Sequence, residues 1–351
     1  LKYTLEETMR ALSPSAADIK DPRGLQFILG RLTNAELAAA PALEPVWLAQ
    51  IERQGMEATT RETALIELAK LRQSSRAAEL AAALVRMDER GKDTGAAGEL
   101  GRLLAAAPRA ELEKIGGTIR RMRTKDHSLA AVRRAGYAAS VVLTGEPAEA
   151  WTSTEASTDS RTVLLDALAL IGDGSLRAKF HPLVAALFAP GAPRLAGNVR
   201  AAALRALPLL GDDNAAASFA ILARQLRTGV QRAVTTRALL QLPRAGWPDA
   251  EAGPLAESVL AYAKSEPATR RTSQDFVETL QLGQDLAARL PAPEATRIRQ
   301  ALRELGVSVF VLKSVREQMR YDVTQLVVEA GKPFEIIFEN VDVMPHNLVV
   351  V

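Results

Sequence analysis

SRTVLLDALALIGD, residues 160–173, and NVRAAALRALPLLGD, residues 198–212, are two copies of one sequence pattern. Their ALxLxGD endings begin at Ala167 and Ala206, which lie 39 residues apart. In both copies apolar residues recur every three to four positions, the spacing of one buried face of an α-helix. In the first copy these residues are Val163, Leu164, Ala167, Leu168, Leu170 and Ile171.

Polar residues and glycines bound both copies. Ser160 precedes the first apolar stripe and Gly172 follows it. Asn198 and Gly211 take the same places in the second copy. Serine and asparagine favour the N-cap of a helix, and glycine favours the position just after its end. We therefore expect one capped helix in each copy.

Further segments extend this pattern along the chain. A weaker third copy, residues 230–246, has its Ala-Leu pair at Ala238, and a fourth candidate is residues 59–71. Second helices are expected between the copies, at residues 180–188 and 215–226. Helix pairs that recur every 30 to 40 residues predict an α-solenoid, and the wording xVRxxALxALxxLGD resembles HEAT repeats. An irregular helical bundle is the alternative, because the repeat lengths vary.

The composition favours helices and excludes several classes of function. Only 4% of the 351 residues are aromatic, and the abundance of Ala and Leu favours helix-on-helix packing through small side chains. The absence of cysteine excludes disulfides and thiol catalysis by this chain. A net charge of +3 does not indicate a nucleic-acid partner. No apolar run reaches the roughly 18 residues that a membrane span requires.

The pattern changes at Gly306 from helical spacing to short segments rich in β-branched and aromatic residues. Four such segments predict strands, and they are residues 307–312, 325–330, 334–340 and 346–351. We therefore expect a mainly α chain with two domains. A HEAT-like helical repeat domain would span residues 1–305, and a small, truncated all-β domain would span residues 306–351.

The all-β segment resembles the N-terminal half of azurin- and plastocyanin-like copper proteins, the cupredoxins. In that family a strand ending in A-G-K/D leads to a strand with F-x-N, then a loop, then a His-Asn that opens the next strand. Residues 319–351 match in this order at Ala330-Gly331-Lys332, Phe338-Glu339-Asn340 and Met344-Pro345-His346-Asn347. The resemblance therefore implies the first part of a cupredoxin-like β-sandwich.

The resemblance also implies a metal ligand. His346 takes the place of the first copper ligand, and Asn347 matches a position that hydrogen-bonds across to the loop holding the other ligands. A type-1 copper site needs two imidazoles and a thiolate, usually with a weak axial thioether. The chain has no cysteine, so by itself it should not form that site. The alternative is that His346 is a polar residue at a strand start with no metal role.

Other polar residues are weaker candidates. His127 is expected near a helix start and His181 within a repeat, and the polar stretch of residues 145–159 is expected to be a loop. Neither GxGxxG nor GxxxxGK[ST] occurs, so no phosphate-binding loop is indicated. Charged helix faces account for Glu62, Glu67, Glu111 and Glu113, and packing between repeats accounts for Trp47, Trp151 and Trp247.

The resemblance suggests a function for the whole. Helical repeats joined to an azurin-like module resemble large secreted bacterial oxidoreductases, in which a copper domain relays electrons from a dehydrogenase to a c-type cytochrome. We expect the chain to be a piece of such a periplasmic or exported protein, with catalysis outside it; whether the parent is an enzyme stays open. The alternative is a protein-interaction scaffold whose β domain does not bind metal.

Overall fold

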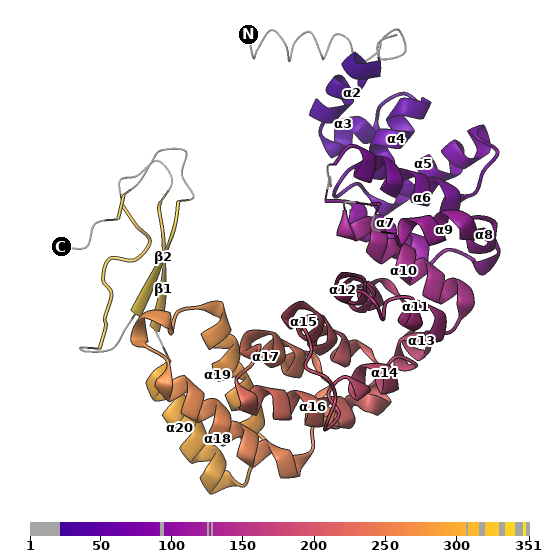
Figure 1. Ribbon diagram of the computed structural model, residues 1–351. Helices are drawn as coiled ribbons and strands as arrows, with labels where there is room; N and C mark the ends of the chain where they lie inside the picture. Colours follow the sequence, from indigo (N-terminus) through magenta and orange to yellow (C-terminus); the bar gives the residue numbers. More distant parts are fainter. Residues whose placement is uncertain are drawn as a thin grey trace. The chain divides into compact units, whose positions relative to one another are not determined.

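A computed structural model of the chain describes residues 22–91, 95–124, 126–127, 129–306, 308–315, 320–329, 334–340 and 347–348. The chain divides into two compact units, Leu1–Gly211 and Asp212–Val351. The described residues are mainly α-helical, as expected, with one pair of short strands near the C-terminal end (Figure 1). The domain boundary expected after residue 305 falls inside the second unit, where helix gives way to strand.

The first unit consists of short helices. Its α-helices and short 3-10 helices (η) are α2 (Pro22–Arg31), α3 (Asn34–Ala38), α4 (Glu44–Glu52), α5 (Ala58–Leu71), α6 (Arg76–Glu89), α7 (Ala97–Ala105), α8 (Arg109–Lys114), α9 (Gly116–Met122), α10 (Ala130–Thr144), α11 (Ala148–Thr152), α12 (Thr158–Ala167), η2 (Leu168–Leu170), α13 (Gly174–Ala178), α14 (His181–Ala186), α15 (Gly197–Ala206) and η3 (Leu207–Leu209). Helix α10 packs against both α7 and α12, and α12 packs against α15. Each helix thus buries its apolar face on its neighbours.

The second unit continues with longer helices and ends in the strands. Its elements are η4 (Asp212–Asn214), α16 (Ala215–Thr228), α17 (Arg232–Gln241), η5 (Arg244–Gly246), α18 (Asp249–Ser265), η6 (Ala268–Arg270), α19 (Gln274–Ala287), α20 (Ala292–Leu305), β1 (Ser308–Lys313) and β2 (Phe334–Glu339). Helix α18 packs on both α16 and α20, and α17 packs on α19, so these helices form two layers. None of the described helices is long and apolar enough to cross a membrane.

The two copies of the ALxLxGD pattern have the same local structure. Helix α12 ends at Ala167 and α15 ends at Ala206, and each is followed directly by a 3-10 turn. The expected N-caps were wrong, whereas Gly211 has a positive φ of 94° just after the 3-10 turn of the second copy, as expected of a glycine there. Ser157 caps α12, because its hydroxyl accepts a hydrogen bond from the Ser160 backbone N–H at 3.2 Å, and α15 has no side-chain cap. The helices therefore begin before Ser160 and Asn198.

Ion pairs join helices that lie one copy apart in the sequence. In eight arginine–carboxylate pairs among the described residues the partners are 38 to 41 residues apart, close to the spacing of the two ALxLxGD patterns; they are Arg61–Glu99, Arg90–Glu52, Arg205–Asp166, Arg237–Asp275, Arg237–Glu278, Arg244–Asp285, Arg289–Asp249 and Arg297–Glu257. Exposed ion pairs add little stability. Their regular spacing nevertheless shows which helices are neighbours.

Arg61 of α5 is a charged side chain within the core, with 1% of its surface exposed. Its Nε donates to the Ile51 carbonyl at 3.1 Å, and its Nη2 donates to the Arg53 carbonyl at 2.7 Å. Both carbonyls lie at the end of α4, where helix carbonyls lack intrahelical partners. Its Nη1 forms an ion pair with Glu99 of α7. Arg61 therefore caps α4 and ties it to two further helices.

Small residues let the helices approach closely. Gly136 of α10 faces the end of α9, and a Cβ atom at this glycine would lie 2.8 Å from Cβ of Met122 and 3.1 Å from the backbone nitrogen of Arg123. Real Cβ atoms do not approach so closely, so the backbones would have to separate. The Ala- and Gly-rich composition thus permits helix contacts that larger side chains would prevent.

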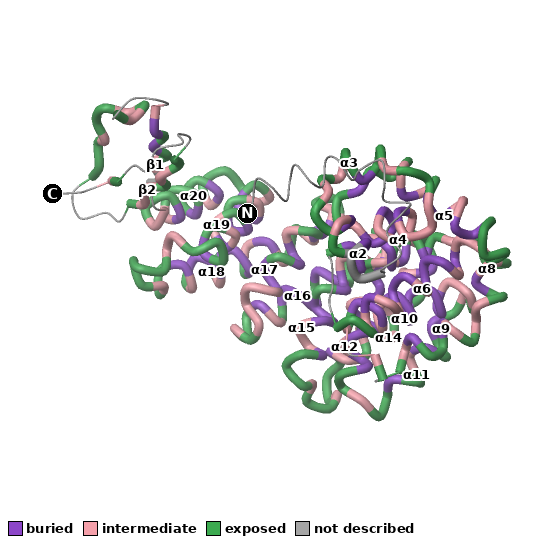
Figure 2. The backbone as a smooth tube through the Cα atoms, turned by 90° about the horizontal axis from the view of Figure 1, so that it is seen from above, coloured by how far each residue is buried: buried purple, intermediate pink, exposed green. Residues whose placement is uncertain are grey.

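The strands form a two-stranded parallel sheet in which Leu312 pairs with Phe338 and Val311 with Ile337. Leu312 is buried, whereas Val311 and Ile337, on the opposite face, are 42% and 43% exposed. Figure 2 shows buried residues throughout the helices and mostly exposed ones around β1 and β2. Parallel sheets ordinarily bury both faces, so the described residues leave one face of this sheet uncovered.

Two of the four expected strands are present. The strand expected over residues 325–330 was wrong for residues 325–329, which belong to no strand. The side chain of Val327 is 78% exposed, and the described sheet consists of β1 and β2. Of the strand expected over residues 346–351, only Asn347 and Leu348 are described, and neither is in a strand.

Replacing Arg61 tests its role in the core. Arg61→Ala leaves two helix-end carbonyls and Glu99 without their partner, so we expect a loss of about 2–4 kcal/mol in the free energy of unfolding. Chemical denaturation followed by circular dichroism measures it. Arg76→Ala is the control, because Arg76 pairs with Glu62 on the surface, and it should cost less than about 1 kcal/mol. Equal losses in the two variants would contradict the assigned role.

Alanine substitutions at two glycines should have opposite effects. Gly136→Ala should lower the stability by about 1–3 kcal/mol, because the methyl group collides with α9. A Cβ at Gly98 of α7 meets nothing within 4 Å, so Gly98→Ala should raise the stability by up to about 1 kcal/mol through helix propensity. Thermal unfolding of both variants measures the difference. A stabilised Gly136→Ala protein would mean that α9 and α10 are not closely packed.

Candidate functional site

The copper ligand implied by the sequence, His346, lies outside the described residues. Its neighbour Asn347 is described and is exposed. The hydroxyl of Tyr321 donates a hydrogen bond to the backbone carbonyl of Asn347. No described contact tests the expected hydrogen bond from Asn347 to a ligand loop, so its role stays a prediction.

Residues on both sides of the segment 341–346 are held at one place. At the end of β2, Asn340 accepts a hydrogen bond from the Ser314 hydroxyl through its Oδ1, at 2.9 Å. Ser314 forms a β-bridge with Tyr321, the residue that binds Asn347. The Tyr321 ring also packs edge-on against Phe338, with centroids 5.5 Å apart. The two ends of the segment that contains His346 are therefore tied to adjacent residues.

The described residues do not form a copper site by themselves. A type-1 site requires a thiolate, and the chain has no cysteine. The described residues contain no group of three or more His, Cys, Asp or Glu side chains placed to hold a metal ion. The residues present therefore do not fit a complete type-1 centre, and His346 could supply only one of its ligands.

The other histidines have local partners or are packed. His127 contacts Asp88, with Nδ1 2.8 Å from Oδ2. His181 is the first residue of α14, its Nε2 is buried without a hydrogen-bond partner among the described residues, and burial lowers its pKa. His127 lies three residues before the first residue of α10, near a helix start as expected, and His181 lies within the helical region.

The acidic residues named in the sequence have structural partners. Three form surface ion pairs, and the fourth accepts a hydrogen bond from a backbone N–H at the start of α6. The contacts are Glu62–Arg76, Glu67–Lys70, Glu113–Arg109 and Glu111–Ala77. Their surroundings are those of solvated helix faces, as expected.

The three tryptophans named in the sequence have different surroundings. Trp247 is 2% exposed and packs against Phe219, with ring centroids 5.2 Å apart. Trp47 packs against the core of the first unit. The packing expected for these two is confirmed. Trp151 packs edge-on against Phe180 and also borders a cavity. It lies on α11, a short helix inside the stretch expected to be a loop.

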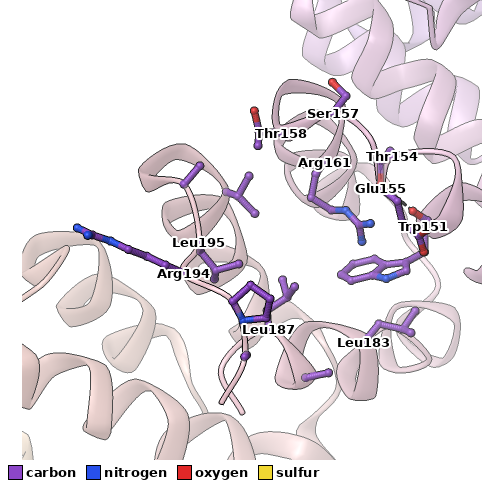
Figure 3. Close-up of a pocket in the computed structure, with 15 residues that line it drawn as sticks. Trp151, Thr154, Glu155, Ser157, Thr158, Arg161, Leu183, Leu187, Arg194 and Leu195 are labelled. Atoms are coloured by element: carbon purple, nitrogen blue, oxygen red, sulfur yellow. Dashed lines mark hydrogen bonds between the residues drawn. The ribbon is translucent and has the colours of Figure 1, made fainter. Parts of the chain in front are cut away.

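This cavity has a volume of about 470 Å³ and lies within the first unit, between α11, α12, α14 and the chain that leads into α15 (Figure 3). Its walls are mainly apolar and include Leu183, Leu187, Leu195 and Val199. Polar groups come from the turn between α11 and α12. The volume falls within the range of roughly 300–1,000 Å³ that small-molecule sites occupy.

Arg161 places a positive charge in this cavity. Its guanidinium lies over the indole of Trp151, with Cζ 3.8 Å from the ring centroid. The residue is 9% exposed, and its Nη1 is buried with no hydrogen-bond partner among the described residues. Burial lowers the pKa of Arg161, and the nearby charge of Glu155 opposes that effect. Arginine stays protonated in proteins, so a charged guanidinium borders the cavity.

The sequence contained a signal for this site. Arg161 precedes Leu164 by three residues and Leu168 by seven, so it lies on the apolar stripe of its own helix. A charged residue on a buried stripe requires a partner. The neighbouring Trp151 and the apolar residues from α14 come close only through tertiary packing, so the sequence alone does not reveal the cavity.

Comparison with family models, with curated proteins and with solved structures finds no match for this chain. What the protein does must therefore be inferred from its own residues.

Proposed function

We propose that the helical region is a scaffold of HEAT-type repeats and that it carries the first part of a cupredoxin-like electron-transfer module. Two observations support the scaffold. The copies at α12 and α15 have the same helix, 3-10 turn and Gly-Asp ending. Ion pairs link residues 38 to 41 positions apart in both units, a spacing close to that of HEAT repeats.

The observation that supports the copper part is the anchoring of the two described residues on either side of residues 341–346. This segment joins Asn340 to Asn347, and both of these residues are hydrogen-bonded to the adjacent pair Ser314 and Tyr321. A ligand that is held in one position costs less to reorganise when the metal changes its oxidation state, which suits electron transfer. The MPHN motif gives His346 its assignment, and the anchored flanks support it.

The chain's own contribution to such a centre is limited to one imidazole. A thiolate, a second imidazole and a weak axial ligand complete a type-1 site, and no described residue takes their place. Blue-copper sites suit compartments outside the reducing cytosol, so we propose a periplasmic or exported setting. In the proposed scheme the redox partners are a dehydrogenase and a c-type cytochrome.

A protein-interaction scaffold is the second candidate. The uncovered face of the β1–β2 sheet favours it, because Val311 and Ile337 lie side by side there and are both exposed. In this case the β segment packs on another protein surface and His346 has no metal role. The DNA sequence that follows the codon for Val351 separates the candidates: a C-x(2–5)-H-x(2–5)-M loop supports copper, and its absence supports the scaffold.

Copper titration of this chain tests the ligand assignment. With one equivalent of Cu(II) we expect no intense blue absorption, because no thiolate is present. We expect a nitrogen-ligated signal in electron paramagnetic resonance, and His346→Ala should weaken the apparent affinity at least about tenfold.

His127→Ala is the matched control, since His127 is already engaged by Asp88, and it should leave the signal unchanged. A signal that survives His346→Ala would remove the support for a copper ligand at this position. An intense blue band in the unmodified chain would contradict the requirement for a thiolate.

A further inference from the structure

One arginine position recurs in the helical copies. Each of these arginines stands seven residues before a buried leucine, and the pairs are Arg61 and Leu68, Arg161 and Leu168, Arg200 and Leu207, and Arg232 and Leu239. Seven residues are two helical turns, so the arginine and the leucine lie on the same face of the helix. The sequence thus places a charge on the buried face in four copies.

At two of these positions the arginine side chains have different surroundings. The guanidinium of Arg61 contacts two carbonyls at the end of α4 and the carboxylate of Glu99, so all three of its nitrogens have partners. Arg161 has the indole of Trp151 on one face, and its Nη1 has no partner. In Arg161 the same side chain points into a cavity rather than to a neighbouring helix end (Figure 3).

The surroundings of Arg161 hold its guanidinium in place. Trp151 packs edge-on against the buried ring of Phe180, with centroids 6.4 Å apart. The indole therefore cannot turn away freely, and an arginine stacked on an aromatic ring is preorganised. A charged guanidinium beside apolar cavity walls is costly for the empty protein, and a bound anion would offset that cost.

The charges around the cavity favour a single negative charge on the ligand. Arg161 and the exposed Arg194 are positive, and Glu155 is the one carboxylate among the residues that line it. No ion pair joins Glu155 to Arg161, although the charge of Glu155 acts on it. The net charge of the lining is therefore +1, too small to favour a dianion such as a phosphate monoester.

The rest of the lining indicates an apolar body. Leucine, valine, proline and alanine side chains from α14, the following loop and α15 face the cavity, opposite the guanidinium (Figure 3). Apolar walls with a few polar groups that fix orientation are typical of small-molecule sites. A strongly hydrated inorganic ion would lose its water here without replacement.

We propose that this cavity is a binding site for a carboxylate with an apolar body. A carboxylate oxygen accepts a hydrogen bond from the guanidinium of Arg161, which borders the cavity, and the apolar part lies against Leu183, Leu187 and Val199. Such a group is present on a free aliphatic acid and on the C-terminus of a peptide that ends in an apolar residue. This site is independent of copper and of His346, so a negative result for one of the two proposals does not affect the other.

The test uses probes that separate charge from apolar character. Octanoate represents a free aliphatic acid, and N-acetyl-leucine represents an apolar C-terminus. Octanamide and N-acetyl-leucine amide have the same apolar parts without the charge, and inorganic phosphate has charge without an apolar part. Binding to the whole chain is measured by isothermal titration calorimetry and by saturation-transfer NMR of the probe.

We expect at least one of the two carboxylates to bind and phosphate not to bind. Each amide should bind at least about tenfold more weakly than its acid, because a hydrogen bond to a charged group contributes a factor of this size. The tighter of the two acids identifies the source of the carboxylate. If neither acid binds, or if an amide binds as tightly as its acid, the proposal is wrong.

Substitutions locate the site. Arg161→Gln should weaken carboxylate binding at least about tenfold, whereas Arg194→Gln, which removes an exposed charge, should weaken it less than about threefold. Leu187→Trp keeps Arg161 and fills the cavity, so it should abolish binding even if Arg161→Gln does not fold. Binding that survives Leu187→Trp, or that responds equally to both arginine substitutions, would place the carboxylate elsewhere and overturn the proposal.

Discussion

The short helices of this chain each have one apolar face, and only neighbouring helices can cover it. An isolated helix of ten to fifteen residues is marginal in water, so α5, α7, α10 and α12 owe their stability to contact with one another. In the first unit one cluster of buried residues extends from Ile51 on α4 to Ala139 on α10, beside a smaller cluster formed by α2, α3 and α4. Close packing through alanine and glycine, as where Gly136 meets Met122, lets the core remain continuous although its side chains are small.

A charge on that buried face must be accommodated by whatever the neighbouring helix presents. Arg61 meets the end of α4, and the carbonyls there match its donors. Arg161 meets α11, which is only five residues long, and the ring of Trp151. One residue type at one repeat position is thus a structural cap in one copy and an unpaired donor at a cavity in another. The difference comes from the neighbouring helix and not from the arginine.

Among the described residues, no neighbouring element covers one face of the β1–β2 sheet. A two-stranded parallel sheet has few backbone hydrogen bonds and ordinarily needs packing on both faces, yet Val311 and Ile337 are exposed. The contacts of Ser314 with Asn340 and of Tyr321 with Asn347 are local, and they tie the chain on either side of residues 341–346. The copper assignment therefore rests on the motif around His346 together with these anchors.

The sequence by itself determined the helical class, the 39-residue spacing of its two clearest copies and the change to strands after Gly306. These properties follow from local spacing and composition, which fix which face of a helix or strand is apolar. It placed α5 within one residue but missed the Ser157 cap and α11, because caps and short helices depend on single contacts. Only the tertiary structure decided that residues 325–329 are not part of a described strand and that Arg161 borders a cavity. Both outcomes depend on which distant segments pack nearby, and no local pattern contains that information.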